Sequence, residues 1–68
     1  MKYNIGDIFI DYNFDEEVRC CLYKIEQEKG VTYYWLTYIN KPSYKETYWT
    51  KEELDEMQKD NVVHLPVN

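Results

Sequence analysis

The sequence Val31-Thr32-Tyr33-Tyr34-Trp35-Leu36-Thr37-Tyr38-Ile39-Asn40 is the longest run of aromatic and β-branched residues in the chain. Residues of these types favour a pleated strand. Successive side chains of a strand point to opposite faces, and here both faces carry large rings, Tyr33 and Trp35 on one and Tyr34 and Tyr38 on the other. A strand with one solvated face would show polar residues there. The run therefore predicts a central strand whose two faces are both covered, by the rest of the chain or by a partner.

The segments around this run are expected to form the other regular elements. Gly30 supplies a positive φ for the hairpin turn before the run, and Pro42 lies in the turn after it. Thr50 and Glu53 have the spacing of a capping box, which opens a helix that runs to about Lys59. Alternating side chains predict strands in a short run after Gly6-Asp7 and at Val18–Glu28, Tyr44–Trp49 and Val62–Leu65.

The same patterns predict which side chains face the core. In the first strand Ile8 and Ile10 share the expected core face, and in the helix Leu54 and Met57 lie together at i,i+3. In the second strand one face carries Cys21, Tyr23 and Ile25. The wetter face of that strand carries Cys20, Leu22, Lys24 and Glu26.

Composition limits the size of the core and the kinds of partner. A chain of 68 residues forms one domain at most, and a core this small supplies only about 3–5 kcal/mol. Thirteen acidic side chains against eight basic ones give a net charge of −5. That balance disfavours nucleic-acid phosphates and anionic membranes, which need a basic surface. Eight tyrosines are more than such a core requires, and tyrosine is enriched at protein interfaces.

Two adjacent cysteines, Cys20 and Cys21, point to opposite faces of a strand and are poorly placed for a disulfide. We interpret them as reduced thiols in a cytoplasmic setting. The first residues have no apolar segment of the secretory type, and no apolar run approaches the ~20 residues of a membrane span.

Catalytic and metal-binding patterns are missing from the sequence. The sole histidine, His64, has no second metal-type ligand near it in sequence, and we expect it to be packed or to lie on an edge strand. Asp7 and Asp11 could form a carboxylate pair, but a turn or solvated role is commoner, and Asp7 is expected to form a turn. We therefore expect no catalytic residues, no cofactor, no metal and no enzyme activity.

Two stretches carry a resemblance to a known fold. Tyr3-Asn4-Ile5-Gly6-Asp7-Ile8-Phe9 resembles the first strand of many small SH3-like barrels. Tyr34–Tyr38, followed by a polar turn and Tyr48-Trp49-Thr50-Lys51-Glu52-Glu53-Leu54, is similar to the ending of chromo-like barrels and of short bacteriophage and mobile-element proteins. The resemblance implies a mainly β domain over residues 1–68: a five-stranded SH3-like barrel with one short helix before the last strand.

The function that follows is that of a small non-enzymatic protein-binding module. By its resemblance to phage proteins it would inhibit or modulate a host or defence protein in the host cytoplasm. Likeness to barrels with the same spacing turns Tyr34, Leu36 and Tyr38 inward and leaves Trp35 as the exposed anchor. The partner is expected to have a basic or mixed surface, and a second copy of the chain is also possible. The residues expected to bind it are Tyr33, Trp35, Tyr48 and Trp49.

Three alternatives remain open. The chain could be a structural or accessory subunit of a larger complex, using the same surface. It could bind nucleic acid by stacking bases on exposed rings, although it lacks a basic groove. It could also hold a methylated lysine in an aromatic cage, as chromo-like barrels do. The rings available for that cage are Tyr3, Tyr23, Trp35, Tyr38, Tyr48 and Trp49.

Overall fold

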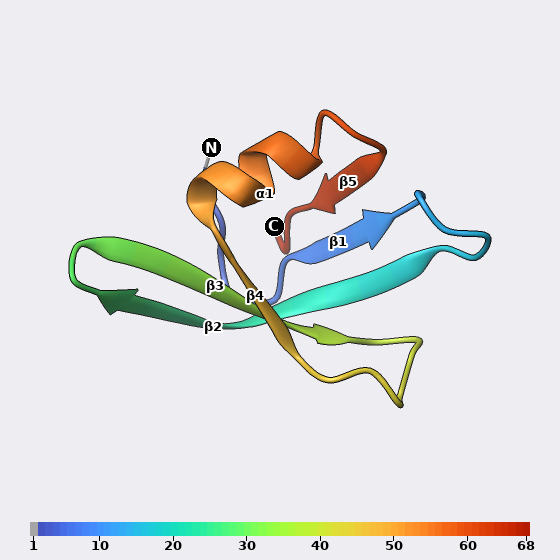
Figure 1. Cartoon of the computed structure of the whole chain (residues 1–68), viewed down its shortest axis with the longest axis horizontal. Helices are drawn as coiled ribbons and strands as arrows, with labels where there is room; N and C mark the ends of the chain where they lie inside the picture. The colour runs from blue at the N-terminus through green and yellow to red at the C-terminus, as the bar shows by residue number, and fades with distance from the viewer. Residues whose placement is uncertain (1) are drawn as a thin grey trace.

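A computed structural model describes residues 2–68 as a five-stranded antiparallel sheet with one short helix (Figure 1). The sheet order is β4-β3-β2-β1-β5. The mainly β prediction, with a short helix before the last strand, is confirmed. In chain order the elements are β1 (Ile8–Asp11), β2 (Val18–Glu28), β3 (Val31–Tyr38), β4 (Thr47–Thr50), α1 (Lys51–Met57) and β5 (Val62–Leu65).

The sheet is curved but open. The long β2–β3 hairpin forms its middle, while β4 and β5 are its two edges and do not pair with each other (Figure 1). The short helix α1 connects these edges and packs on the inner, concave side. The closed barrel implied by the resemblance is therefore not seen.

The core lies between the inner face of the sheet and α1. Tyr34 and Leu36 of β3 are buried, which confirms their predicted inward orientation, and Tyr38 is half-buried on the same side. Leu54 of α1 is fully buried, and Met57 packs against the same cluster. The buried cluster consists of Tyr3, Phe9, Leu22, Tyr34, Leu36, Leu54 and Val62.

The predicted core face of β1 is wrong. Phe9 is only 3% exposed and Asp7 is completely buried, whereas Ile8 and Ile10 are half-buried on the outer face. The Phe9 side chain points into the interior, where its ring centroid lies 5.6 Å from that of Tyr3. Alternation shows which residues share a face, but which face is covered depends on the elements packed against it.

The predicted core face of β2 is wrong before a β-bulge, whereas beyond the bulge Lys24 and Glu26 lie on the outer, wetter face as predicted. Leu22, expected on the wetter face, is fully buried opposite Leu36. The pairing then shifts by one residue, so that Lys24, and not Tyr23, lies opposite Trp35. An extra residue in one strand reverses the faces that strict alternation predicts. Tyr23, the extra residue at the bulge, and Ile25, beyond it, are both exposed, so neither joins the core as predicted.

Turn geometry follows the sequence closely. Lys29 and Gly30 form a two-residue hairpin loop with φ values of 52° and 80°, which confirms the role expected for Gly30. Pro42 lies in the turn between β3 and β4, as predicted. Four boundaries differ from those expected: β3 ends at Tyr38, β4 begins at Thr47 and ends at Thr50, and α1 ends at Met57. Beyond the shortened ends the chain forms turns instead, held by hydrogen bonds such as that from the Tyr44 N–H to the Lys41 carbonyl.

Replacing Thr50 with alanine is expected to destabilise the fold by about 1 kcal/mol. The Thr50 hydroxyl accepts the Glu53 N–H at 3.2 Å, and the Glu53 carboxylate accepts the Thr50 N–H at 2.8 Å, which confirms the capping box. Urea denaturation followed by circular dichroism would measure the loss. Thr50→Ser keeps the acceptor oxygen and should be near wild type; equal loss in both variants would contradict a capping role.

Candidate functional site

Three aromatic side chains form a cluster on the outer face of the sheet. Trp35 of β3 lies directly opposite Tyr48 of β4, and their ring centroids are 4.7 Å apart. The ring of Tyr33 meets that of Tyr48 edge-on at 5.5 Å. Because Tyr33 and Trp35 are two residues apart, they share the face that points away from the core. We call Tyr33, Trp35 and Tyr48 the outer aromatic cluster.

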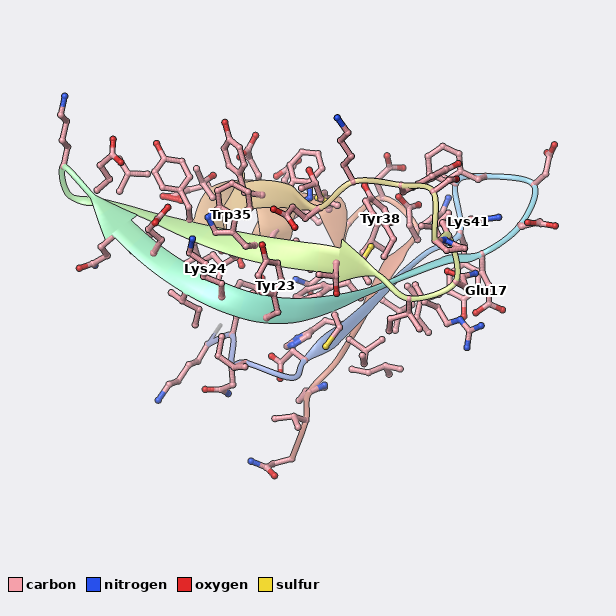
Figure 2. The ribbon with its side chains drawn as sticks, turned by 90° about the horizontal axis from the view of Figure 1, so that it is seen from below. Glu17, Tyr23, Lys24, Trp35, Tyr38 and Lys41 are labelled. Carbon is pink, nitrogen blue, oxygen red and sulfur yellow. The ribbon has the colours of Figure 1, made fainter. Side chains whose placement is uncertain are left out.

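Trp35 is held in place by two charged residues of β2. Its indole Nε1–H donates to Glu26 Oε1 at 3.3 Å, and the Lys24 ammonium lies 5.2 Å from the ring centroid. Lys24 and Glu26 also form an ion pair at 3.5 Å. Figure 2 shows Lys24 and Tyr23 beside Trp35 over the hairpin. The bulge in β2 makes this arrangement, because it sets Lys24 opposite the indole.

The cluster is accessible, although Trp35, which was expected to be an exposed anchor, is half-buried on the outer face. Tyr48 is 53% exposed. A shallow depression lies on each side of Trp35. One is lined by Tyr33, Tyr48, Glu26 and Glu28. The other contains Tyr38, Tyr44, Glu46 and Lys45.

Trp49, the fourth predicted partner-binding residue, lies on the opposite face. It pairs with Tyr34 and packs against the buried cluster. The four predicted residues therefore do not form one surface. The proposed cage residues are separated too, because Tyr3 is buried in the core while Tyr48 is exposed on the outside.

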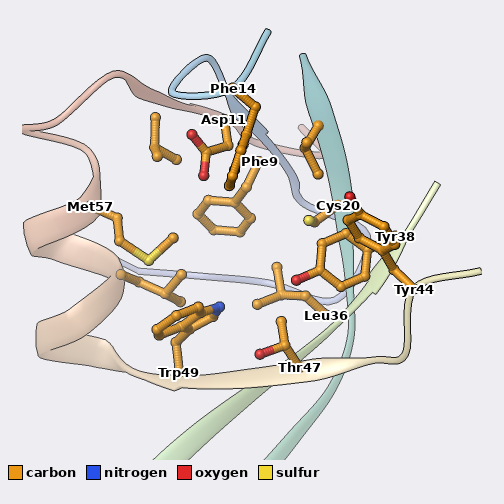
Figure 3. A pocket seen from close by; sticks show the side chains of 13 residues that line it. Phe9, Asp11, Phe14, Cys20, Leu36, Tyr38, Tyr44, Thr47, Trp49 and Met57 are labelled. Atoms are coloured by element: carbon orange, nitrogen blue, oxygen red, sulfur yellow. The ribbon is translucent and has the colours of Figure 1, made fainter. Parts of the chain in front are cut away.

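A cavity of about 320 Å³ opens on the inner side of the sheet (Figure 3). Phe9, Leu36 and Trp49 form part of its apolar wall, and the rings of Phe14 and Tyr44 stand at its rim. These two rim residues are 64% and 54% exposed. The cavity exists because β4 and β5 do not close the sheet. Sequence reasoning missed it, since its walls come from β1, β2, β3, β4, α1 and β5 and from the loops between them.

The cavity also contains the thiol of Cys20. Burial, helped by the negative charge of Asp11, raises the pKa of this thiol to about 11. A protonated thiol is a poor nucleophile and a poor metal ligand. Both cysteines are free, as we expected.

Asp7, just before β1, and His64 of β5 form a buried pair next to Phe9. His64 Nε2 lies 2.7 Å from Asp7 Oδ2, and the imidazole stacks on Phe9 at 4.8 Å. Asp7 also accepts the N–H groups of Asn4 and Val67, at 3.0 and 2.9 Å. The packed position expected for His64 is confirmed. The turn role of Asp7 is confirmed as well, but the residue also joins the two ends of the chain.

The carboxylates of Asp7 and Asp11 have no hydrogen-bond partner in common. Asp11 Oδ1 accepts the backbone and side-chain N–H groups of Asn13. Within residues 2–68 no three His, Cys, Asp or Glu side chains are grouped so as to hold a metal ion. In the same part of the chain no helix has the length and apolar character needed to cross a membrane.

Comparisons of the chain with protein-family models, with curated proteins and with solved structures find no match.

Proposed function

We propose that this protein is a small non-enzymatic binding module whose contact surface is the outer aromatic cluster. The observation that carries this proposal is that Tyr33, Trp35 and Tyr48 converge on the outer face instead of filling the core. Aromatic rings of this kind dominate the binding energy of protein interfaces. Trp35 is already held by Glu26 and Lys24, so little side-chain entropy remains to be lost when a partner binds.

The partner carries a basic or mixed surface. Glu26 and Glu28 line one depression beside Trp35, and Glu46 lines the other. Lys24, which lies against the indole, is already paired with Glu26, and Lys45 lines the second depression together with Glu46. A net charge of −5 adds a long-range attraction toward basic proteins, which raises the rate of encounter.

The biological role rests on the sequence resemblance, with which the order of the elements agrees although the sheet does not close. Five antiparallel strands with a short helix before β5 fit an SH3-like arrangement left open between β4 and β5. By that resemblance the protein is of phage or mobile-element type and acts in the host cytoplasm as an inhibitor or modulator of a host or defence protein. Its partner is a protein; nucleic acid and membranes are not its targets.

Trp35→Ala is expected to fold and to lose its partner. Removal of a central interface tryptophan costs at least about 2 kcal/mol, or roughly thirtyfold in Kd. The test is capture of partners from bacterial lysate with tagged protein, followed by titration of the captured partner against wild type and variant. Circular dichroism would check the fold of each variant.

Tyr12→Ala is the matched control, because Tyr12 is 52% exposed and outside the cluster. Capture that is lost with Trp35→Ala and kept with Tyr12→Ala supports the proposed surface. Equal capture by both variants would refute it. If the wild type runs as a dimer and Trp35→Ala as a monomer in size-exclusion chromatography, the surface binds a second copy of the chain.

Expression in a bacterial host separates an inhibitor from an accessory subunit of a larger complex. An inhibitor changes growth or defence on its own, and Trp35→Ala should abolish that effect. An accessory subunit leaves host physiology unchanged while still capturing its partner.

A further inference from the structure

The inner cavity combines aromatic walls with one free carboxylate oxygen. Asp11, Phe9 and Phe14 stand on one side of it, and Trp49 and Thr47 stand on the other (Figure 3). Both hydrogen bonds to Asp11 reach Oδ1, and within residues 2–68 no donor reaches Oδ2. In the same residues no lysine, arginine or histidine pairs with Asp11. The cavity is thus mainly apolar but contains an uncompensated negative charge.

The charged groups near the rim do not cancel this charge. Lys41 lies beside Phe14 and Tyr44, but its ammonium is paired with Glu16. Asp15 lines the same neighbouring depression and adds a second acid. A neutral apolar ligand would leave the Asp11 carboxylate without a partner, and an anion would be repelled by it. A cation with an apolar stem satisfies both the walls and the carboxylate.

We propose that the inner cavity binds a lysine or arginine side chain of the partner, with its stem against Phe9, Leu36 and Trp49 and its cationic group at Asp11 Oδ2. This inference rests on the proposed function and names the partner chemistry that the cavity selects.

The cavity adjoins the depression beside Trp35, because both are lined by Tyr38 and Tyr44. Tyr38 and Tyr44 pack edge-on with their centroids 5.1 Å apart. This pair lines the cavity on one side and the depression beside Trp35 on the other. A partner that covers Trp35 can therefore extend a basic side chain past Tyr44 into the cavity.

Side-chain analogues test the cavity without any partner. The probes are n-butylammonium and n-propylguanidinium, with 1-butanol as the neutral analogue and pentanoate as the anion. Binding would be followed by NMR at the Leu36 and Val62 methyl groups and the Trp49 indole. We expect saturable shifts with the two cations, binding about tenfold weaker for 1-butanol, and none for pentanoate.

Asp11→Asn should remove the preference for cations, leaving n-butylammonium and 1-butanol with equal affinity. Asp15→Asn is the matched control, because its carboxylate is exposed in the adjacent loop, and it should keep the preference. If Asp11→Asn does not fold, the wild type alone can test the proposal. Raising the salt concentration should weaken the binding of n-butylammonium but not that of 1-butanol. Equal affinity of wild type for n-butylammonium and 1-butanol, or no saturable shift with either cation, would overturn the proposal. Because the assay contains no partner, its outcome is independent of the Trp35→Ala experiment. The cavity proposal can fail while the proposed function is supported, and the proposed function can fail while the cavity binds cations.

Discussion

Replacing Asp7 with alanine is expected to destabilise the protein by about 3–5 kcal/mol, because each buried polar group left unsatisfied costs about 1–3 kcal/mol and the Asp7 carboxylate serves three of them. The Asp7 carboxylate is completely buried and accepts hydrogen bonds from His64 and from the Asn4 and Val67 N–H groups. Alanine would leave all three partners unsatisfied in the interior. A domain of this size has only about that much stability in total, so the variant should be largely unfolded at 25 °C.

Far-ultraviolet circular dichroism and urea denaturation would measure this loss. Asp7→Asn keeps an oxygen acceptor but removes the charge, and it should lie between alanine and wild type. Asp15→Asn, an exposed carboxylate in the β1–β2 loop, should change stability by less than about 0.5 kcal/mol. A folded Asp7→Ala protein with wild-type stability would show that the pair does not hold the chain ends.

The same carboxylate predicts how stability depends on pH. Burial alone would raise the pKa of Asp7, but the hydrogen bonds from Asn4, His64 and Val67 outweigh it and hold the pKa below its ordinary value. A carboxyl whose pKa is lowered by folding stabilises the protein above its unfolded pKa of about 3.9 and loses that effect as pH falls through the lower folded value. Wild type should therefore lose stability below about pH 4.

The comparison with Asp7→Asn isolates this effect. Glu16 and Asp55 also have lowered pKa values, because Lys41 and Lys51 donate to them, and they remain in both proteins. The difference in the free energy of unfolding between wild type and Asp7→Asn should shrink as pH falls from 5 to 2. A difference that is constant over this range would mean that Asp7 is not ionised in the folded protein.

Leu54→Ala is expected to cost about 2–5 kcal/mol, the range for a fully buried leucine. Leu54 is 0% exposed and is the buried residue by which α1 is anchored to the sheet. Leu54 also lines the inner cavity, so its truncation enlarges an existing space. The surrounding side chains can then do little to fill the added volume. The loss should therefore lie toward the upper part of that range.

Leu65→Ala is the matched control, since Leu65 is 46% exposed on β5. It should cost less than about 1 kcal/mol. Denaturation of the two variants under identical conditions would give the comparison. A small loss for Leu54→Ala would mean that α1 is not held by this side chain, and the cavity would then not have a rigid wall.

The positions of most elements could be predicted from local patterns. The bounds of Val18–Glu28 and Val62–Leu65 match the structure, and Thr50 with Glu53 forms the expected cap. Local sequence suffices in these cases because strand alternation, turn φ values and helix capping depend on neighbouring residues. The faces of β1 and β2 could not be predicted, because the bulge beside Tyr23 and the packing around Phe9 depend on distant segments.

The candidate sites also contain features that local sequence predicts and features that depend on distant segments. Sequence singled out Tyr33 and Trp35 as a pair on one strand face, but the register of β4 decided that Tyr48 joins them and Trp49 does not. The inner cavity and the Asp7–His64 pair have no local signal, since their members are far apart in the chain.

By itself, then, the sequence determined a mainly β chain with one capped helix, a surplus of tyrosine and an acidic surface. Only the tertiary structure decided which rings are buried, which are exposed and where the sheet stays open. Those outcomes depend on pairing between strands that are distant in sequence, and a shift of one residue in that pairing moves a side chain from one face to the other.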